Sequence, residues 1–266
     1  MLWAKALIVA KERSIPLYVY QWNRLAFRDL IRGQKRTRLY SKYIRSKSLR
    51  AYGRALLSLF REKQLVEPDA EVDPDETGRV FVLRPAAGLV DFAILKKHRQ
   101  EIIREFNCLL EPSIRTAIAE LNSPVLGVHI RRGDFTSTKL DIPLSYYSDR
   151  IEQLRKLAGK QIPVTIFSDG TAEELGEVIG LPSVMFARNE NDLLDLLQLS
   201  KSEIIVPAFA STFSYWAAFL SENAAIIHHP RSWAKNIRPD QITAFEGDLE
   251  NDQQCEAFRQ FLSARL

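Results

Sequence analysis

The second half of the chain alternates short apolar runs with amphipathic segments. After Asn122, Ser123 and Pro124 come five apolar runs, "VLGVHI", "PVTIFSD", "SVMFA", "EIIVP" and "AAIIHH". Segments of helical period separate them, at Ser145–Leu157, Thr171–Ile179, Asn191–Leu199 and Ser211–Leu220. This order predicts a parallel sheet of five strands joined by right-handed crossover connections. An amphipathic helix is expected at the end, over Gln253–Leu266.

The first half reads as a smaller α/β region. Helices are expected at Leu2–Lys11, Asn23–Arg32, Phe92–Leu109, Glu111–Leu121 and over part of Arg36–Phe60, strands at Ile15–Tyr20 and Arg79–Pro85, and a loop at Val66–Gly78. The change of pattern near Asn122 predicts a basic α/β domain over 1–122, a nucleotide-binding domain over 123–250 and a C-terminal helix over 251–266.

Composition narrows the class of protein. The 266 residues are 46% hydrophobic and 26% charged, as in a soluble globular protein. Cys108 and Cys255 form neither a disulfide framework nor a zinc motif. No apolar run is long enough to span a membrane, and the first residues do not read as a signal peptide. We therefore expect a cytoplasmic protein.

Charge is unevenly distributed along the chain. Residues 1–63 hold sixteen Lys and Arg against three acids, while the remainder is net acidic. Such a basic region favours an anionic partner such as a phosphorylated ligand, a nucleic acid or a membrane surface, although solvated helix faces explain it equally well. Without an RNA-binding motif or a helix-turn-helix, a nucleic-acid-binding protein is the least favoured of these. Peripheral membrane contact through this region stays open.

Two arginines directly follow the first strand of the expected sheet. "VLGVHI" runs into Arg131, Arg132, Gly133 and Asp134. His129 and Arg131 are two residues apart on a strand, so they point to the same face. Guanidinium groups bind phosphate oxygens bidentately, and ligands of parallel sheets bind at the carboxyl ends of the strands. An anion site is one interpretation, and an Arg–Asp134 surface pair is the other.

Two further polar groups are expected at the same edge. Ser168 and Asp169 end the second strand, where they would contact a ribose or base, or simply form a turn with Gly170. Ser211 or Thr212 would cap a helix whose N-terminus suits an anion, or would only cap a buried helix. Zinc motifs, a P-loop, the GxGxxG fingerprint and a GxSxG elbow are all absent from the sequence.

The three motifs "HIRRGD", "FSD" and "STFSYWAAFL" together resemble those of the α-1,2-fucosyltransferases. The resemblance implies a GT-B-like fold of two Rossmann-like domains, here with an incomplete N-terminal domain on the acceptor side. Family members carry a first strand and a glycine-rich loop before the helix at Leu2–Lys11, and this chain starts at that helix. It also implies inverting transfer of fucose from GDP-fucose to a hydroxyl of an acceptor glycan, without metal or cofactor.

The resemblance also assigns roles to residues. Arg131 and Arg132 would bind the donor diphosphate, and His129 and Asp169 would contact the guanosine. Ser211 and Thr212, with the N-terminus of the following helix, would support the phosphates. Ser168, Phe213 and Ser214 are further donor-binding candidates. Arg131 and Asp134 would be catalytic, with Asp141 as a second candidate for the general base. A non-catalytic relative that binds nucleotide sugars or glycans is the alternative, because the glycine-rich loop is missing.

Overall fold

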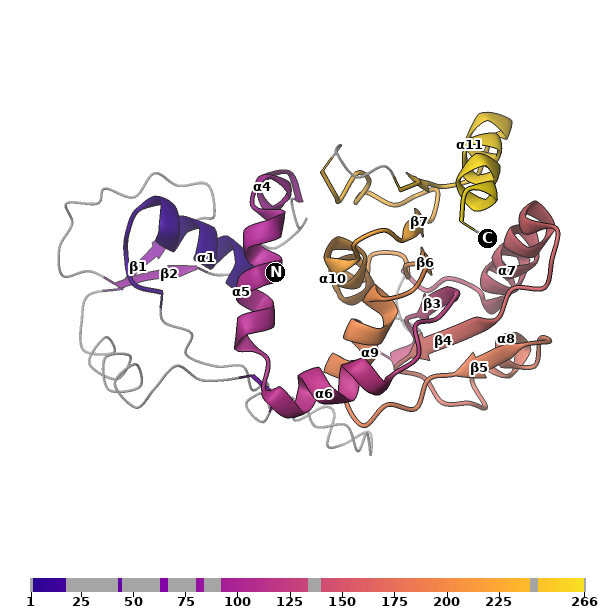
Figure 1. Ribbon diagram of the computed structural model, residues 1–266, viewed down its shortest axis with the longest axis horizontal. Coiled ribbons are helices and arrows are strands. Elements are labelled where there is room, and N and C mark those ends of the chain that lie inside the picture. The colour runs from indigo at the N-terminus through magenta and orange to yellow at the C-terminus, as the bar shows by residue number, and fades with distance from the viewer. Residues whose placement is uncertain are drawn as a thin grey trace. The chain divides into compact units, whose positions relative to one another are not determined.

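The computed structural model describes residues 2–17, 43–44, 63–66, 80–83, 92–133, 140–239 and 244–265 (Figure 1). The chain divides into two compact units, Met1–Arg115 and Thr116–Leu266. Each is described by itself, and the predicted boundaries after residues 122 and 250 stay predictions. Among the described residues no helix has both the length and the apolar character needed to cross a membrane.

The second unit is built on one parallel sheet of six strands. Its order is β5-β4-β3-β6-β7-β8, and every neighbouring pair is parallel. The strands are β3 (Leu126–Ile130), β4 (Val164–Ser168), β5 (Val184–Phe186), β6 (Ile204–Val206), β7 (Ala225–Ile227) and β8 (Glu246–Gly247). The five strands predicted from the sequence are confirmed. The prediction missed β8, because a polar pair of two residues leaves no apolar run to detect.

Helices cover the sheet at α7 (Leu144–Ala158), α8 (Gly176–Ile179), α9 (Asp192–Ser200), α10 (Thr212–Leu220) and α11 (Asp252–Ser263). Four lie where they were predicted, to within a few residues. The helix predicted over Thr171–Ile179 was wrong in its first half. There Thr171 N–H donates to Glu174 and Glu174 N–H donates back to Thr171, which closes a turn before α8 begins.

Strand β3 lies in the interior of the sheet, and all five of its residues are buried. Leu126, Val128 and Ile130 join a cluster with side chains of α7 and α11, including Ile151 and Phe258. The alternate residues face the other helices, where Gly127 lies against α9 and His129 against Phe213 of α10. The two-sided burial explains the nearly continuous apolar run that identified this strand.

The first unit contains α1 (Leu2–Glu12), the parallel strand pair β1 (Lys63–Val66) and β2 (Val80–Leu83), α4 (Phe92–Lys97) and α5 (Arg99–Leu109). Helix α6 (Pro112–Glu120) runs across the boundary between the units. Trp3 of α1 packs on Phe106 of α5, with ring centroids 6.1 Å apart, and Lys11 pairs with Glu101.

Several helices, strands and loops predicted for the first half differ from the structure or lie outside the described residues. The helix predicted over Phe92–Leu109 is two helices, separated at His98. Residues 15–17, the described start of the predicted strand Ile15–Tyr20, form no strand, and Val66 ends β1 rather than opening a loop. The segments predicted over Asn23–Arg32, most of Arg36–Phe60 and the rest of Val66–Gly78 lie outside the described residues.

The close contact between β3 and α9 depends on glycine at position 127, which has no Cβ. A Cβ at Gly127 would overlap Ser202 Oγ and lie 2.7 Å from Leu199 Cδ1. We expect Gly127→Ala to destabilise the protein by about 1–3 kcal/mol, since overpacking pushes α9 from the sheet. Thermal unfolding should show a fall in Tm of several degrees. Gly176→Ala in α8 is the matched control, because nothing lies within 4 Å of its added Cβ. An equal response from both variants would contradict this account.

Candidate functional site

Asp169 links the ends of two neighbouring strands at the carboxyl edge of the sheet. Its Oδ1 accepts the backbone N–H of Arg132 at 2.8 Å, and its Oδ2 lies 3.0 Å from Arg131 Nη1. The carboxylate that follows β4 therefore holds the chain where it leaves β3. The Arg131 and Asp169 side chains are only 20% and 24% exposed, so the pair is partly withdrawn from water.

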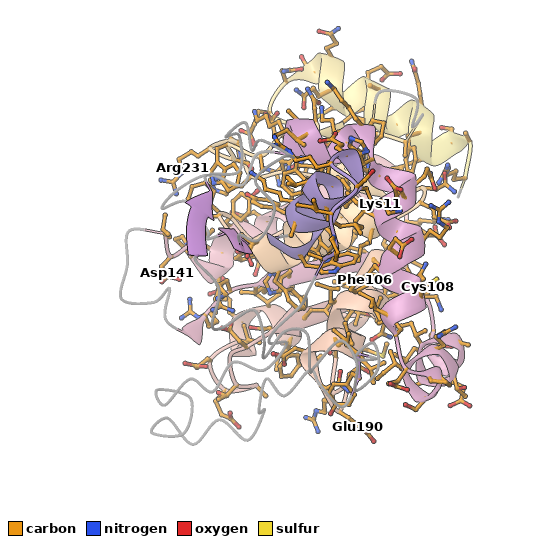
Figure 2. The ribbon with its side chains drawn as sticks, turned by 90° about the vertical axis from the view of Figure 1, so that its left-hand side faces the viewer. Lys11, Phe106, Cys108, Asp141, Glu190 and Arg231 are labelled. Carbon is orange, nitrogen blue, oxygen red and sulfur yellow. The ribbon has the colours of Figure 1, made fainter. Side chains whose placement is uncertain are left out.

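Arg132 has a different carboxylate partner from Arg131. Its Nη1 lies 3.1 Å from Asp141 Oδ1, just before α7, and Figure 2 labels Asp141. The Nε atom of Arg132 is buried and has no hydrogen-bond partner in the part of the chain that the structure describes. Both arginines of the motif are thus paired, but with Asp169 and Asp141. Asp134, the partner that the sequence suggested, lies outside the described residues.

Two glycines make the close approach of these groups feasible. Gly133 has φ +35°, and a Cβ there would lie 2.5 Å from Asp169 Oδ2. A Cβ at Gly170 would lie 2.8 Å from Arg132 Cγ. The "RRG" and "SDG" segments therefore pack against each other: Gly133 leaves room for Asp169, and Gly170 leaves room for Arg132. The spacing of these segments in the sequence does not indicate this contact.

His129 is buried beside the first turn of α10. It is 3% exposed, and its ring lies 5.0 Å from that of Phe213, centroid to centroid. Its Nδ1 atom finds no hydrogen-bond partner among the described residues. Burial, reinforced by the charge of Arg131, lowers the pKa of His129 to about 3. At neutral pH this imidazole is an uncharged group with one polar atom still unsatisfied.

The start of α10 lies at the same edge of the sheet, directly after β6. Ser211 is its N-cap residue and is buried, Thr212 is exposed and Phe213 is partly exposed. The first N–H groups of a helix have no partner within the helix, so they favour negative charge. Predicted site residues from β3, β4 and α10 therefore lie around the carboxyl ends of adjacent strands β4, β3 and β6.

Two of the predicted site hydroxyls are used within the protein. Ser214 is fully buried, and its Oγ accepts the N–H of Ala208 and donates to the carbonyl of Ser211. Ser168 Oγ accepts the N–H of Gly170 at 3.0 Å. Both hydroxyls thus bond to backbone groups and stabilise the loops that follow β6 and β4.

Tyr215 was missed by sequence reasoning. Its hydroxyl accepts the N–H of Ala210 at 3.2 Å and lies 2.8 Å from Ser232 Oγ. Ala210 has φ +55°, a left-handed conformation that is costly for alanine, immediately before the N-cap of α10. Tyr215 thus holds a strained turn in place. A tyrosine in an apolar helix gives no local sign of this role, because both partners lie in other segments.

The neutral state of His129 makes a prediction for stability. A histidine whose pKa is lowered on folding contributes fully above its ordinary pKa of 6.5, and that contribution is lost as the pH falls toward about 3. Roughly 2 kcal/mol should be lost between neutral pH and pH 5. Urea unfolding at both pH values should show a smaller loss for His129→Gln than for the wild type. Equal losses would contradict the buried neutral imidazole.

Comparisons with known proteins place the chain among glycosyltransferases. No curated protein sequence is matched. Similar solved structures include NodZ α-1,6-fucosyltransferase soaked with GDP-fucose, at 18% identity and TM-score 0.43, covering 70% of this chain and 63% of that one. NodZ from Bradyrhizobium matches at 22% identity and TM-score 0.35, over 49% of each chain. POFUT1 in complex with GDP-fucose matches at 17% identity and TM-score 0.38, covering 57% of this chain and 51% of that one.

This chain spans less than two thirds of the length of the NodZ and POFUT1 chains. The family model of glycosyl transferase family 11 matches residues 91–245. That match includes β3, β4, α10 and all the predicted site residues. Since it extends over more than half of the sequence, the chain belongs to glycosyl transferase family 11.

Proposed function

We propose that this protein transfers fucose from GDP-fucose to a hydroxyl of an acceptor glycan, with inversion and in α-1,2 linkage. Family membership supports a glycosyltransferase, and the "HIRRGD", "FSD" and "STFSYW" motifs support the donor and the linkage. The observation that carries the proposal is the pair of partly buried guanidinium groups, Arg131 and Arg132, beside the N-terminus of α10.

The arginines bind the donor diphosphate in this proposal. Arginine keeps its charge when it is desolvated and presents several donors in one plane. Arg132 Nε is a donor with no acceptor among the described residues, and a phosphate oxygen would satisfy it. The N-terminal turn of α10, with Ser211, Thr212 and Phe213, adds backbone N–H groups and a favourable dipole. Ser214 and Ser168 act indirectly, through the loops that they hold.

The guanosine lies toward β4, where the resemblance places it. Asp169 follows that strand, and His129 Nδ1 supplies the unsatisfied polar atom between β4 and α10. Because His129 is uncharged at neutral pH, its role is a neutral hydrogen bond with the ligand rather than proton transfer or charge neutralisation.

The reaction is a single displacement at the anomeric carbon of fucose. An acceptor hydroxyl oxygen forms the new bond while the bond from that carbon to the β-phosphate oxygen breaks, and GDP leaves. Negative charge grows on the diphosphate, where Arg131 and Arg132 stabilise it. We assign Asp134 to accept the hydroxyl proton. The other candidate, Asp141, is already engaged by Arg132, which supports this choice.

Metal independence is part of the proposal. No group of three or more His, Cys, Asp and Glu side chains capable of holding a metal occurs in the part of the chain that the structure describes. Two guanidinium groups offer the neutralisation that a diphosphate needs.

We further propose a cytoplasmic enzyme that uses a GDP-sugar and a glycan, with the basic segment 1–63 available to an anionic membrane surface.

GDP should stabilise the folded protein, and Arg131→Lys should remove most of this effect. At about one hundred times its dissociation constant a ligand adds roughly 2.7 kcal/mol, or several degrees in Tm. Lysine cannot make the two-pronged contact. Thermal unfolding with GDP, ADP and UDP measures this. Arg259→Lys, on an exposed stretch of α11, is the matched control and should keep the full GDP shift. An unchanged GDP shift in Arg131→Lys would refute the assignment.

Turnover separates an enzyme from a binding protein. Incubation with GDP-fucose and a set of glycan acceptors should release GDP only when an acceptor is present, and Arg131→Ala should abolish that release. Linkage analysis of the product by NMR tests the α-1,2 assignment. GDP binding without acceptor-dependent release would show a binding protein instead.

A further inference from the structure

We infer that Trp233 is a sugar-binding residue, against which a pyranose ring of the acceptor stacks. This inference rests on the proposed function and assigns a part of the acceptor site. It starts from the surface, where Trp233 is the one aromatic among the exposed large hydrophobic side chains of the described residues. The other two are Leu140, next to an undescribed segment, and Met185 in the middle of β5 at the opposite end of the sheet.

The exposure of Trp233 contrasts with its neighbours in sequence. The indole is 38% exposed, whereas Ser232 and Ala234 on either side are 7% and 4% exposed. Ser232 Oγ is hydrogen-bonded to Tyr215 and donates to the carbonyl of Ala234. The backbone on both sides of Trp233 is therefore held in the protein while the indole stays at the surface. A single exposed hydrophobic residue is common, so its position must carry the argument.

That position is beside the start of α10. The Trp233 ring packs edge-to-face on Tyr215, with centroids 5.5 Å apart and planes at 80°. Tyr215 is the fourth residue of α10 and bonds Ala210, which immediately precedes the N-cap Ser211. One tyrosine thus touches both the indole and the turn that leads into the proposed phosphate site. The aromatic contact also holds the indole rigid, which lowers the entropy cost of binding a ligand there.

The strand order gives the direction of the donor across this edge. The exits of β4, β3, β6 and β7 follow one another, each about 4.8 Å from the next. In the proposed function the guanosine lies at β4 and the phosphates lie between β3 and β6. The donor sugar and the acceptor then lie farther along, toward β7. Trp233 follows β7, on the loop that also carries Arg231, labelled in Figure 2.

An indole suits one face of a sugar. A pyranose has an apolar face of C–H groups, and an aromatic side chain with a flat surface and one N–H can cover that face at low conformational cost. One cation on the same loop, Arg231, adds polar capacity. Its guanidinium lies 5.1 Å above the Phe209 ring and has no carboxylate partner among the described residues. The ligand class is therefore a pyranose of the acceptor glycan, with its hydroxyl groups turned toward solvent and Arg231.

Saturation-transfer NMR on the full chain with GDP tests this inference. The probes are methyl β-D-galactopyranoside, methyl β-D-glucopyranoside and methyl N-acetyl-β-D-glucosaminide. We expect at least one to receive saturation at its ring C–H protons from the wild type and from Trp233→Phe, which keeps an aromatic face. Trp233→Leu should weaken its binding by roughly threefold to tenfold. Met185→Ala, which removes an exposed apolar side chain far from β7, should bind like the wild type.

The inference is overturned if none of the three glycosides binds the wild type, or if Trp233→Leu binds as tightly as the wild type. The GDP-induced shift in Tm, measured on the same samples, keeps the two proposals apart. A GDP shift that survives while sugar binding ignores Trp233 leaves the donor assignment standing and refutes the stacking. Sugar binding that depends on Trp233 without any GDP shift supports the stacking and refutes the GDP-sugar transferase.

Discussion

The burial of β3 on both faces governs how this protein places charge. Arginine is costly to desolvate inside a strand whose five residues are all buried, and Arg131 and Arg132 come directly after the last of them, Ile130. Alternation along the strand then separates them. Arg131 follows the face of His129 and α10, while Arg132 turns toward Asp141 and the start of α7. Because β3 pairs with both β4 and β6, whatever its exit holds is next to the ends of both neighbours.

At the carboxyl end of β3, Arg131 and Arg132 each form an ion pair with a carboxylate, so they do not form an uncompensated positive patch. Asp169 and Asp141 compensate the charges of Arg131 and Arg132, which limits the cost of desolvating each guanidinium. A ligand must therefore offer the arginines more than a carboxylate does. A diphosphate meets this condition, since it carries more charge and has oxygens enough for both arginines and for the N–H groups of α10. In the proposed function, selectivity for a diphosphate over a singly charged anion would therefore follow from the carboxylates as much as from the arginines.

The sequence was informative where one strand or helix decides the outcome. The alternation after Asn122 predicted five parallel strands, and carboxyl-end placement brought Arg131, Asp169 and Ser211 to one edge. It failed where two distant segments decide. Nothing near Asp141 or Asp169 in the sequence indicates which arginine each holds. The sequence around Tyr215 likewise gives no sign that its hydroxyl bonds Ala210 and lies beside Ser232. Strand β8 was missed for a simpler reason, because two residues are too few to show a period.

In the "STFSYW" motif some side chains stabilise the turn before α10, and other groups stay accessible to a ligand. Ser214 forms hydrogen bonds with the backbone of Ala208 and Ser211. Tyr215 forms them with Ala210 and with Ser232. These two side chains of the motif therefore stabilise the turn before α10. Phe213 packs against His129, and Trp216 is buried. What the turn leaves for a ligand is the exposed Thr212 and the backbone N–H groups of the first helical turn. The strained turn at Ala210 is held by Tyr215, and the ring of the same tyrosine packs edge-to-face against Trp233.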